Sequence, residues 1–322
     1  MPRESAPSGR ARCLAEARRI SGAALVLALV IAVLSPGREH GAAQSRSEHV
    51  HHRHLRVDAP WGSTRVLVTY PRRRDGRDAP PGERWPVLVA LHGQGEARRG
   101  PDRGFLGWAV DYRLPDAFGA LARGRVTAAD FGGMVRPERL REVNARLARR
   151  SFGGLLVITP YTPDLMAEPV GGPGIVQYAE WLAGPMLAAV RAAHPNAATG
   201  RESTGIDGVS LGGMLALEAG LRHPEAFRTV GALQPAVRGR EEALAALARP
   251  DDAQVIRLLT SDGDPFRGPT STLSDALRTR HVAHDLAVVP GPHDYSFNRG
   301  PGGLEMLLFH DTHLPREPVA AR

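Results

Sequence analysis

Apolar runs separated by amphipathic segments recur along most of the chain. Residues 86–91 form an unbroken apolar run, which is typical of a strand buried on both faces of a mostly parallel sheet. The same kind of pattern predicts strands at 154–160, 205–209, 229–233, 254–260 and 285–289, and helices at 174–193, 211–222, 240–248, 272–280 and 302–310. Strands that alternate with helices predict a doubly wound sheet with right-handed crossovers.

Two segments depart from this alternation. Residues 53–58 and 64–70 alternate apolar and polar side chains around a Pro-Trp-Gly-Ser turn, which predicts an antiparallel hairpin. Residues 96–152 are too many for one crossover helix, and we predict two helices there, at 115–122 and 137–150. The pattern thus predicts one α/β domain over 55–322. It has about eight strands, an N-terminal hairpin, and a helical insertion at 96–152 that caps one end of the sheet and shapes the substrate pocket.

The first 43 residues predict an export signal. Arg10, Arg12, Arg18 and Arg19 precede an apolar run at 20–34, a Pro-Gly pair ends that run, and Gly41-Ala42-Ala43 offers small residues to a signal peptidase. The run is shorter than the roughly 20 residues of a membrane-spanning helix. We therefore expect cleavage near Ala43, with an uncleaved membrane anchor as the alternative. Either outcome places the protein in the periplasm, the cell envelope or the extracellular space.

A polar linker is predicted at 44–54, and its histidines either bind a transition metal or are incidental. The formal charge is +7, and all 41 basic residues are arginine, which suggests a GC-rich genome. These arginines are spread among 34 acidic residues, whereas nucleic-acid binders cluster them on one face, so we expect no nucleic-acid partner. Cys13 is the only cysteine and lies before the apolar run, so a cleaved chain would hold no thiol and no cysteine-metal site. No metal or other cofactor is expected.

Residues 208–212, Gly-Val-Ser-Leu-Gly, fit the G-x-S-x-G turn that presents a nucleophilic serine. Ser210 falls between a predicted strand and a predicted helix, which is the context that this motif requires. A serine hydroxyl needs a base to remove its proton. In this architecture the base is a histidine after the last strand, and His293 occupies that place in a proline-rich loop.

A carboxylate is then needed to orient the histidine, and the chain order Ser, Asp, His places it between the two. The strand at 254–260 runs into two aspartates, Asp262 and Asp264. We favour Asp264, because Pro265 biases the preceding residue toward an extended conformation, whereas Asp262-Gly263 resembles turn chemistry.

Acyl transfer also needs donors for the oxyanion. The backbone N–H of Leu211, directly after the nucleophile, is the first donor that we predict. The second comes from the loop that follows the strand at 86–91. We assign it to the backbone of Gln94, with Gly93 as the alternative, because the glycines of His92-Gly93-Gln94-Gly95 let the chain approach a substrate closely.

These motifs resemble the α/β-hydrolase superfamily, and within it the putative-esterase family of esterase-D-like S-formylglutathione hydrolases, enterochelin and feruloyl esterases and mycolyltransferases. The resemblance covers about Leu55 to His313. It rests on LHGQG at 91–95, IDGVSLGGMLAL at 206–217, HPEAF at 223–227, SDGDPF at 261–266 and PGPHDYSFNRG at 290–300.

The resemblance implies hydrolysis of a small-molecule carboxylic ester by a metal-free triad of Ser210, Asp264 and His293. Three alternatives stay open from the sequence. One is an acyltransferase, in which a hydroxyl acceptor replaces water. The others are a catalytically silent binding protein of the same fold and a peptidase. The family pattern has no clear counterpart for the insertion at 96–152.

Overall fold

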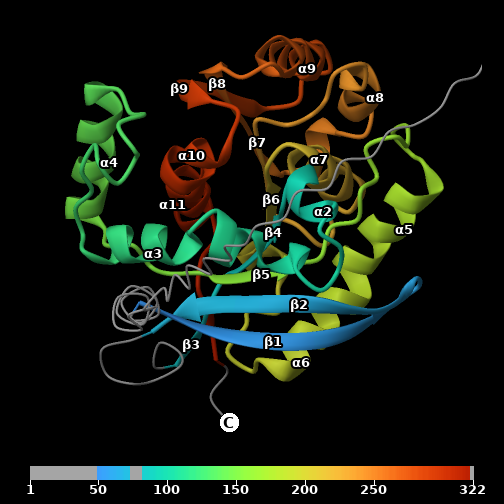
Figure 1. Cartoon of the computed structure of the whole chain (residues 1–322), viewed down its shortest axis with the longest axis horizontal. Coiled ribbons are helices and arrows are strands. Elements are labelled where there is room, and N and C mark those ends of the chain that lie inside the picture. The colour runs from blue at the N-terminus through green and yellow to red at the C-terminus, as the bar shows by residue number, and fades with distance from the viewer. Residues whose placement is uncertain (1–48, 73–81, 320–322) are drawn as a thin grey trace, which may run out of the picture.

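The computed structural model describes residues 49–72 and 82–319, and the export signal predicted at 1–43 lies outside these ranges. An eight-stranded sheet runs through the molecule in the order β1-β2-β5-β4-β6-β7-β8-β9 (Figure 1). Its strands are β1 (Val50–Ala59), β2 (Gly62–Pro71), β4 (Val87–Leu91), β5 (Leu156–Pro160), β6 (Thr204–Gly208), β7 (Thr229–Leu233), β8 (Val255–Gly263) and β9 (His284–Pro292). The hairpin β1–β2 and its neighbour β5 pair antiparallel, and the remaining pairs are parallel. A small sheet joins β3 (Glu83–Arg84) and β10 (Glu317–Pro318).

Helices cover both faces of the sheet, as Figure 1 shows. One face packs on α5 (Pro173–Trp181), α6 (Leu187–Ala193), α7 (Leu211–Arg222), α8 (Glu241–Ala245) and α9 (Arg267–Thr279). The other face packs on α3 (Leu114–Ala122), α4 (Pro137–Arg149) and α11 (Gly303–His313). Each face has its own cluster of buried apolar side chains, so the central strands are buried on both sides.

The predicted fold class is confirmed, and α7 and β7 begin and end at the predicted residues. The predicted linker at 44–54 is wrong at its C-terminal end. Strand β1 already begins at Val50, because its pairing with β2 extends over the whole of both strands. The helix predicted at 174–193 is interrupted by a π-helix, η3 (Leu182–Met186), which contains Pro185. Proline has no N–H to donate to the preceding turn, and a wider turn accommodates that loss.

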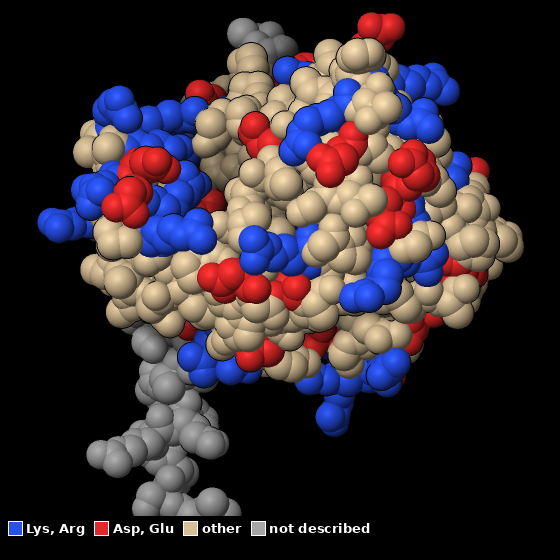
Figure 2. All heavy atoms as spheres, turned by 90° about the horizontal axis from the view of Figure 1, so that it is seen from above, with Lys and Arg blue, Asp and Glu red and all other residues tan. Residues whose placement is uncertain are grey.

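The insertion begins with α2 (Gln94–Ala97), η1 (Gly104–Leu106) and the π-helix η2 (Gly107–Asp111), and it continues through α3 and α4. Helix α4 stands at the edge of the molecule, and Figure 2 shows the basic side chains that gather there. It buries only Val143 and Leu147 of its own residues. Ion pairs from Arg139 to Glu305 and from Arg146 to Asp311 attach it to α11.

Candidate active site

Ser210 lies on a sharp turn between β6 and α7. Its backbone has φ 57° and ψ −116°, a conformation that L-residues rarely adopt and that marks strained functional positions. The two glycines of the motif are required by space. A Cβ at Gly208 would lie 2.3 Å from the carbonyl oxygen of Gly212, and a Cβ at Gly212 would lie 2.4 Å from that of Leu91. The turn is therefore possible only because residues 208 and 212 have no side chain.

His293 follows β9 and faces this serine. Its Nε2 lies 3.1 Å from Ser210 Oγ, and its Nδ1 lies 2.8 Å from Asp264 Oδ1. The ring of Phe266 packs edge-on against the imidazole, with 5.4 Å between the ring centroids. A single line of hydrogen bonds thus joins the three residues in the order serine, histidine, aspartate.

The position of Asp264 depends on an irregular end of β8. The register of β8 against β9 shifts between Ser261 and Gly263, and such a shift re-aims the side chains that follow it. The Asp264 carboxylate is buried and accepts hydrogen bonds from Thr260 Oγ1 at 2.6 Å and from the backbone N–H of Phe266 at 2.9 Å. These two donors, together with the N–H of the His293 ring, hold the carboxylate in the orientation that faces the imidazole.

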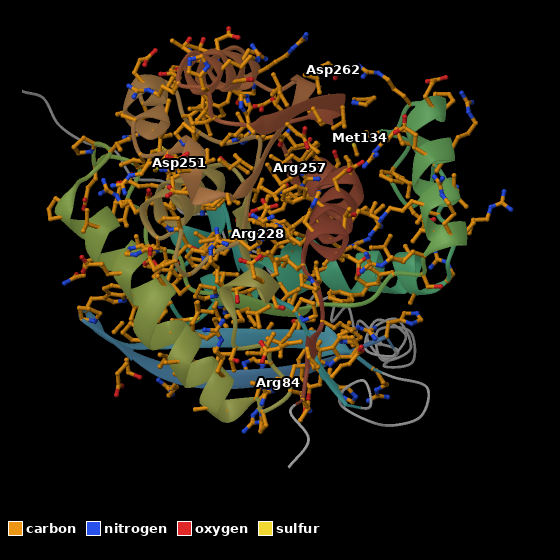
Figure 3. The ribbon with its side chains drawn as sticks, turned by 180° about the vertical axis from the view of Figure 1, so that it is seen from behind. Arg84, Met134, Arg228, Asp251, Arg257 and Asp262 are labelled. Atoms are coloured by element: carbon orange, nitrogen blue, oxygen red, sulfur yellow. The ribbon has the colours of Figure 1, made fainter. Side chains whose placement is uncertain are left out.

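The competing aspartate has a different partner. Asp262 is exposed, and Figure 3 shows it at the outer end of β8. Its Oδ1 accepts the backbone N–H of Gly291 at 3.0 Å. Asp262 therefore ties β8 to the loop that carries His293, while Asp264 contacts the imidazole itself.

The loop after β4 forms the opposite wall of the site. Gln94 is the first residue of α2 and Leu211 the first of α7. The N–H groups in the first turn of a helix have no acceptor within the helix, so both residues offer free backbone donors. The N–H of Gly93 already has a partner, because it donates to the hydroxyl of Tyr112 at 3.0 Å.

His92 is buried and holds the start of this loop. The backbone N–H of Thr162 donates to His92 Nε2 at 2.9 Å, so the ring proton lies on Nδ1, where it faces the carbonyl oxygen of Gly93 at 3.0 Å. Burial lowers the pKa of His92 to about 4. The imidazole is thus neutral at pH 7 and acts as a fixed donor and acceptor.

A cleft of about 170 Å³ opens beside the serine. Its polar lining includes Glu96, Tyr112, Gln234 and Tyr295, none of which the motifs predicted as a triad residue or an oxyanion donor. Gln234 has a left-handed backbone, with φ 44°. Its side-chain amide donates to Ser261 Oγ at 2.6 Å and to the carbonyl oxygen of Pro292 at 2.8 Å, directly before His293. A glutamine after a strand carries no recognisable signal, so only the fold brings it to the site.

Three histidines of β1 contact separate partners, two on β2 and one on η1. His52 Nδ1 lies 3.0 Å from Thr69 Oγ1, His51 stacks on Tyr70, and His54 packs on Phe105. Over 49–72 and 82–319, no three His, Cys, Asp or Glu side chains are grouped so as to hold a metal ion.

Residues 164–255 match the family described as "Putative esterase", and no curated protein matches the chain. Several solved structures share its fold. A ferulic acid esterase is 15% identical, with a TM-score of 0.59, and the alignment covers 83% of this chain and 99% of that one. The S-formylglutathione hydrolase of Staphylococcus aureus is 15% identical, with a TM-score of 0.50 and coverages of 82% and 97%. An enterobactin and salmochelin hydrolase is 16% identical, with a TM-score of 0.51 and coverages of 84% and 99%.

The structural neighbours share the α/β-hydrolase fold. At 15–16% sequence identity, this similarity establishes the fold alone. The family match covers the strand that leads into Ser210, the whole of α7 and the strand β7. Family and fold agree with the resemblance that the sequence motifs indicated. Residues 164–255 are thus similar to the putative-esterase family, and the domain has the α/β-hydrolase fold.

Proposed function

We propose that the protein is an exported serine esterase that cleaves carboxylic esters through an acyl-enzyme. Ser210 attacks the ester carbonyl while His293 takes its proton, and His293 then protonates the departing alcohol. Asp264 holds the imidazole and stabilises its charged form. Water, activated by the same histidine, releases the acid. The line of hydrogen bonds from Ser210 Oγ through His293 to Asp264 is the observation that carries this proposal.

In this proposal the oxyanion of the tetrahedral intermediate accepts hydrogen bonds from the backbone N–H groups of Leu211 and Gln94. Gln94 lines the cleft beside Ser210. The alternative donor, Gly93, is disfavoured because its N–H donates to Tyr112.

The small cleft favours small-molecule esters with a short acyl chain. Its volume of about 170 Å³ leaves room for an acetyl or butyryl group beside Ser210. The reaction needs no cofactor. An acyltransferase would use the same groups with another acceptor, and a silent binding protein would keep the geometry without turnover.

Export follows from the N-terminal pattern of arginines, apolar run and small residues. Among the residues that the structure describes, none belongs to a helix of the length and hydropathy that crossing a bilayer requires.

The test is turnover of p-nitrophenyl acetate, butyrate and decanoate by the full chain, beside Ser210→Ala. Ser271→Ala, a change at a half-buried serine on α9, is the matched control. We expect the wild type and the control to hydrolyse acetate and butyrate faster than decanoate, and Ser210→Ala to lose turnover and labelling by a fluorophosphonate. Turnover that survives Ser210→Ala refutes the mechanism. A folded wild-type chain that is labelled at Ser210 but leaves every ester intact points to another acyl substrate or acceptor, and one that is not labelled supports a silent fold.

A further inference from the structure

Glu96 is a buried carboxylate beside the proposed oxyanion hole, and the mechanism above gives it no role. Its side chain is 2% exposed, although it lines the cleft that contains Ser210. Burying a carboxylate is unfavourable unless donors surround it. Two tyrosines provide them. The hydroxyl of Tyr112 donates to Oε2, and the hydroxyl of Tyr295 donates to Oε1 at 2.6 Å.

These two tyrosines come from distant parts of the chain. Tyr112 follows η2 in the insertion, and Tyr295 begins α10 (Tyr295–Phe297), two residues after His293. Glu96 itself lies on α2, within the loop that carries Gln94. The carboxylate therefore connects the oxyanion loop, the insertion and the loop of the histidine at a single point.

The direction of the hydrogen bond between Tyr112 and Glu96 determines what the Tyr112 oxygen does next. Since the hydroxyl of Tyr112 donates its proton to Glu96, its oxygen is free to accept, and it accepts the backbone N–H of Gly93. This leaves Gln94 as the next backbone donor along the loop. On the other side, the carboxylate of Asp294 accepts the N–H of Ser296 at 2.7 Å and so holds α10 just after His293.

The local sequence is fitted to this cluster. A Cβ at Gly95 would lie 3.0 Å from the hydroxyl of Tyr295, and a Cβ at Gly107 would lie 2.8 Å from Glu96 Cγ. Arg99 adds positive charge at the rim, with its guanidinium 3.1 Å from the hydroxyl of Tyr295 and 3.9 Å from Glu96 Oε1. Hydrogen bonds to a charged acceptor in a buried place are stronger than ordinary ones.

We propose that Glu96, with Tyr112 and Tyr295, forms a clamp that holds the oxyanion loop and the His293 loop in register with Ser210. Glu96 and Tyr295 are positioning residues, since they act through Gln94 and His293. The catalytic consequence rests on the proposed function, because a clamp of this kind raises the rate only if those two residues take part in the reaction. Groups that align reacting atoms affect the chemical step more than substrate binding.

The experiment compares full-length wild type with Glu96→Gln, Tyr295→Phe and the double variant. Glu218→Gln is the matched control for the first change, because Glu218 is a buried glutamate on α7 that pairs with Arg222. Tyr178→Phe is the control for the second, because it removes a buried hydroxyl that bonds to the backbone of Tyr161. Two quantities are measured for each protein: kcat and KM with p-nitrophenyl acetate, and amide hydrogen exchange of residues 93–97 and 293–297 by mass spectrometry.

We expect each clamp variant to lower kcat at least tenfold with KM changed by less than threefold, and to speed exchange in both segments. The double variant should be no more than threefold worse than the poorer single one, because both changes break one unit. The controls should change neither quantity. Unchanged exchange in either segment, or a kcat within twofold of wild type, overturns the clamp. If Glu96→Gln fails to fold, Tyr295→Phe decides the matter, since it deletes one half-buried hydroxyl. Turnover that survives Ser210→Ala refutes the proposed function instead, and the exchange measurement then tests the clamp by itself.

Discussion

Acidification should destabilise the protein through His92. In the folded chain this imidazole accepts the N–H of Thr162 at Nε2, so a second ring proton would face a donor. Burial accordingly lowers its pKa from 6.5 to about 4. The unfolded chain takes up the proton near pH 6.5 and the folded chain does not. The stabilisation is therefore complete above pH 6.5 and is lost as the pH falls toward 4.

The size of the effect follows from the difference between the two pKa values. A difference of about 2.5 units corresponds to roughly 3 kcal/mol once the pH is below both values, and about 2 kcal/mol of that is lost between pH 7 and pH 5. The free energy of unfolding should be measured by urea denaturation at pH 7, 6 and 5. The proteins to compare are the wild type, His92→Gln and His281→Gln, the last being a change at an exposed histidine.

His92→Gln lowers the free energy of unfolding at pH 7, because a neutral amide replaces the ring at a buried site. It also removes the titrating group, so its stability should fall less than that of the wild type between pH 7 and pH 5, by about 2 kcal/mol. His281→Gln should follow the wild type at each pH. Equal slopes for the wild type and His92→Gln would refute the reasoning, since the pH dependence would then come from other groups.

Three further results are expected. Asp264→Asn should lower kcat/KM about 10³-fold or more, because an amide at this position favours the wrong tautomer of His293. Asp262→Asn should leave kcat/KM within about tenfold of wild type. A larger loss for Asp262→Asn than for Asp264→Asn in steady-state kinetics would exchange the roles of the two aspartates. Gly212→Ala should abolish turnover and lower the free energy of unfolding by about 1–3 kcal/mol, because its methyl group would meet the Leu91 carbonyl; near-normal activity in a folded variant would contradict this. Burial, with Glu96 as a further cause, raises the pKa of Tyr295 to about 12. The unfolded chain therefore ionises first, and stability is lost as the pH rises above 10. Tyr295→Phe should weaken that alkaline loss of stability in denaturation curves, and curves identical to those of the wild type would contradict this prediction.

Local sequence carries the parts of this site that depend on backbone form. The motif around Ser210 predicted both the turn and the helix that follows, because the glycines at 208 and 212 are required by contacts within and beside that turn. The choice between Asp262 and Asp264 was harder. It depends on a register shift between β8 and β9, and Pro265 gives only a preference for the direction of one residue.

Other parts depend on contacts between distant residues. Glu96 reaches Tyr112 over 16 positions and Tyr295 over 199, and no local pattern relates these residues. A buried network further along the sheet is similar. The carboxylate of Asp207 accepts the N–H of Gly208 and lies 3.1 Å from His310 Nε2. Arg257 on β8, labelled in Figure 3, lies 3.6 Å from the same carboxylate. In sequence alone, Asp207 is one polar residue in an otherwise apolar strand.

The insertion contributes more to the site than the cap that its length suggested. It supplies Glu96 and Tyr112 to the cleft. It also packs against the segments on either side of His293. A Cβ at Gly300 would lie 2.6 Å from the carbonyl oxygen of Phe131, and a Cβ at Gly291 would lie 2.9 Å from Met134 Sδ, so the two segments are in close contact. One insertion therefore packs against the loops on both sides of Ser210. Changes within it should alter the alignment of the reacting groups as well as the shape of the pocket.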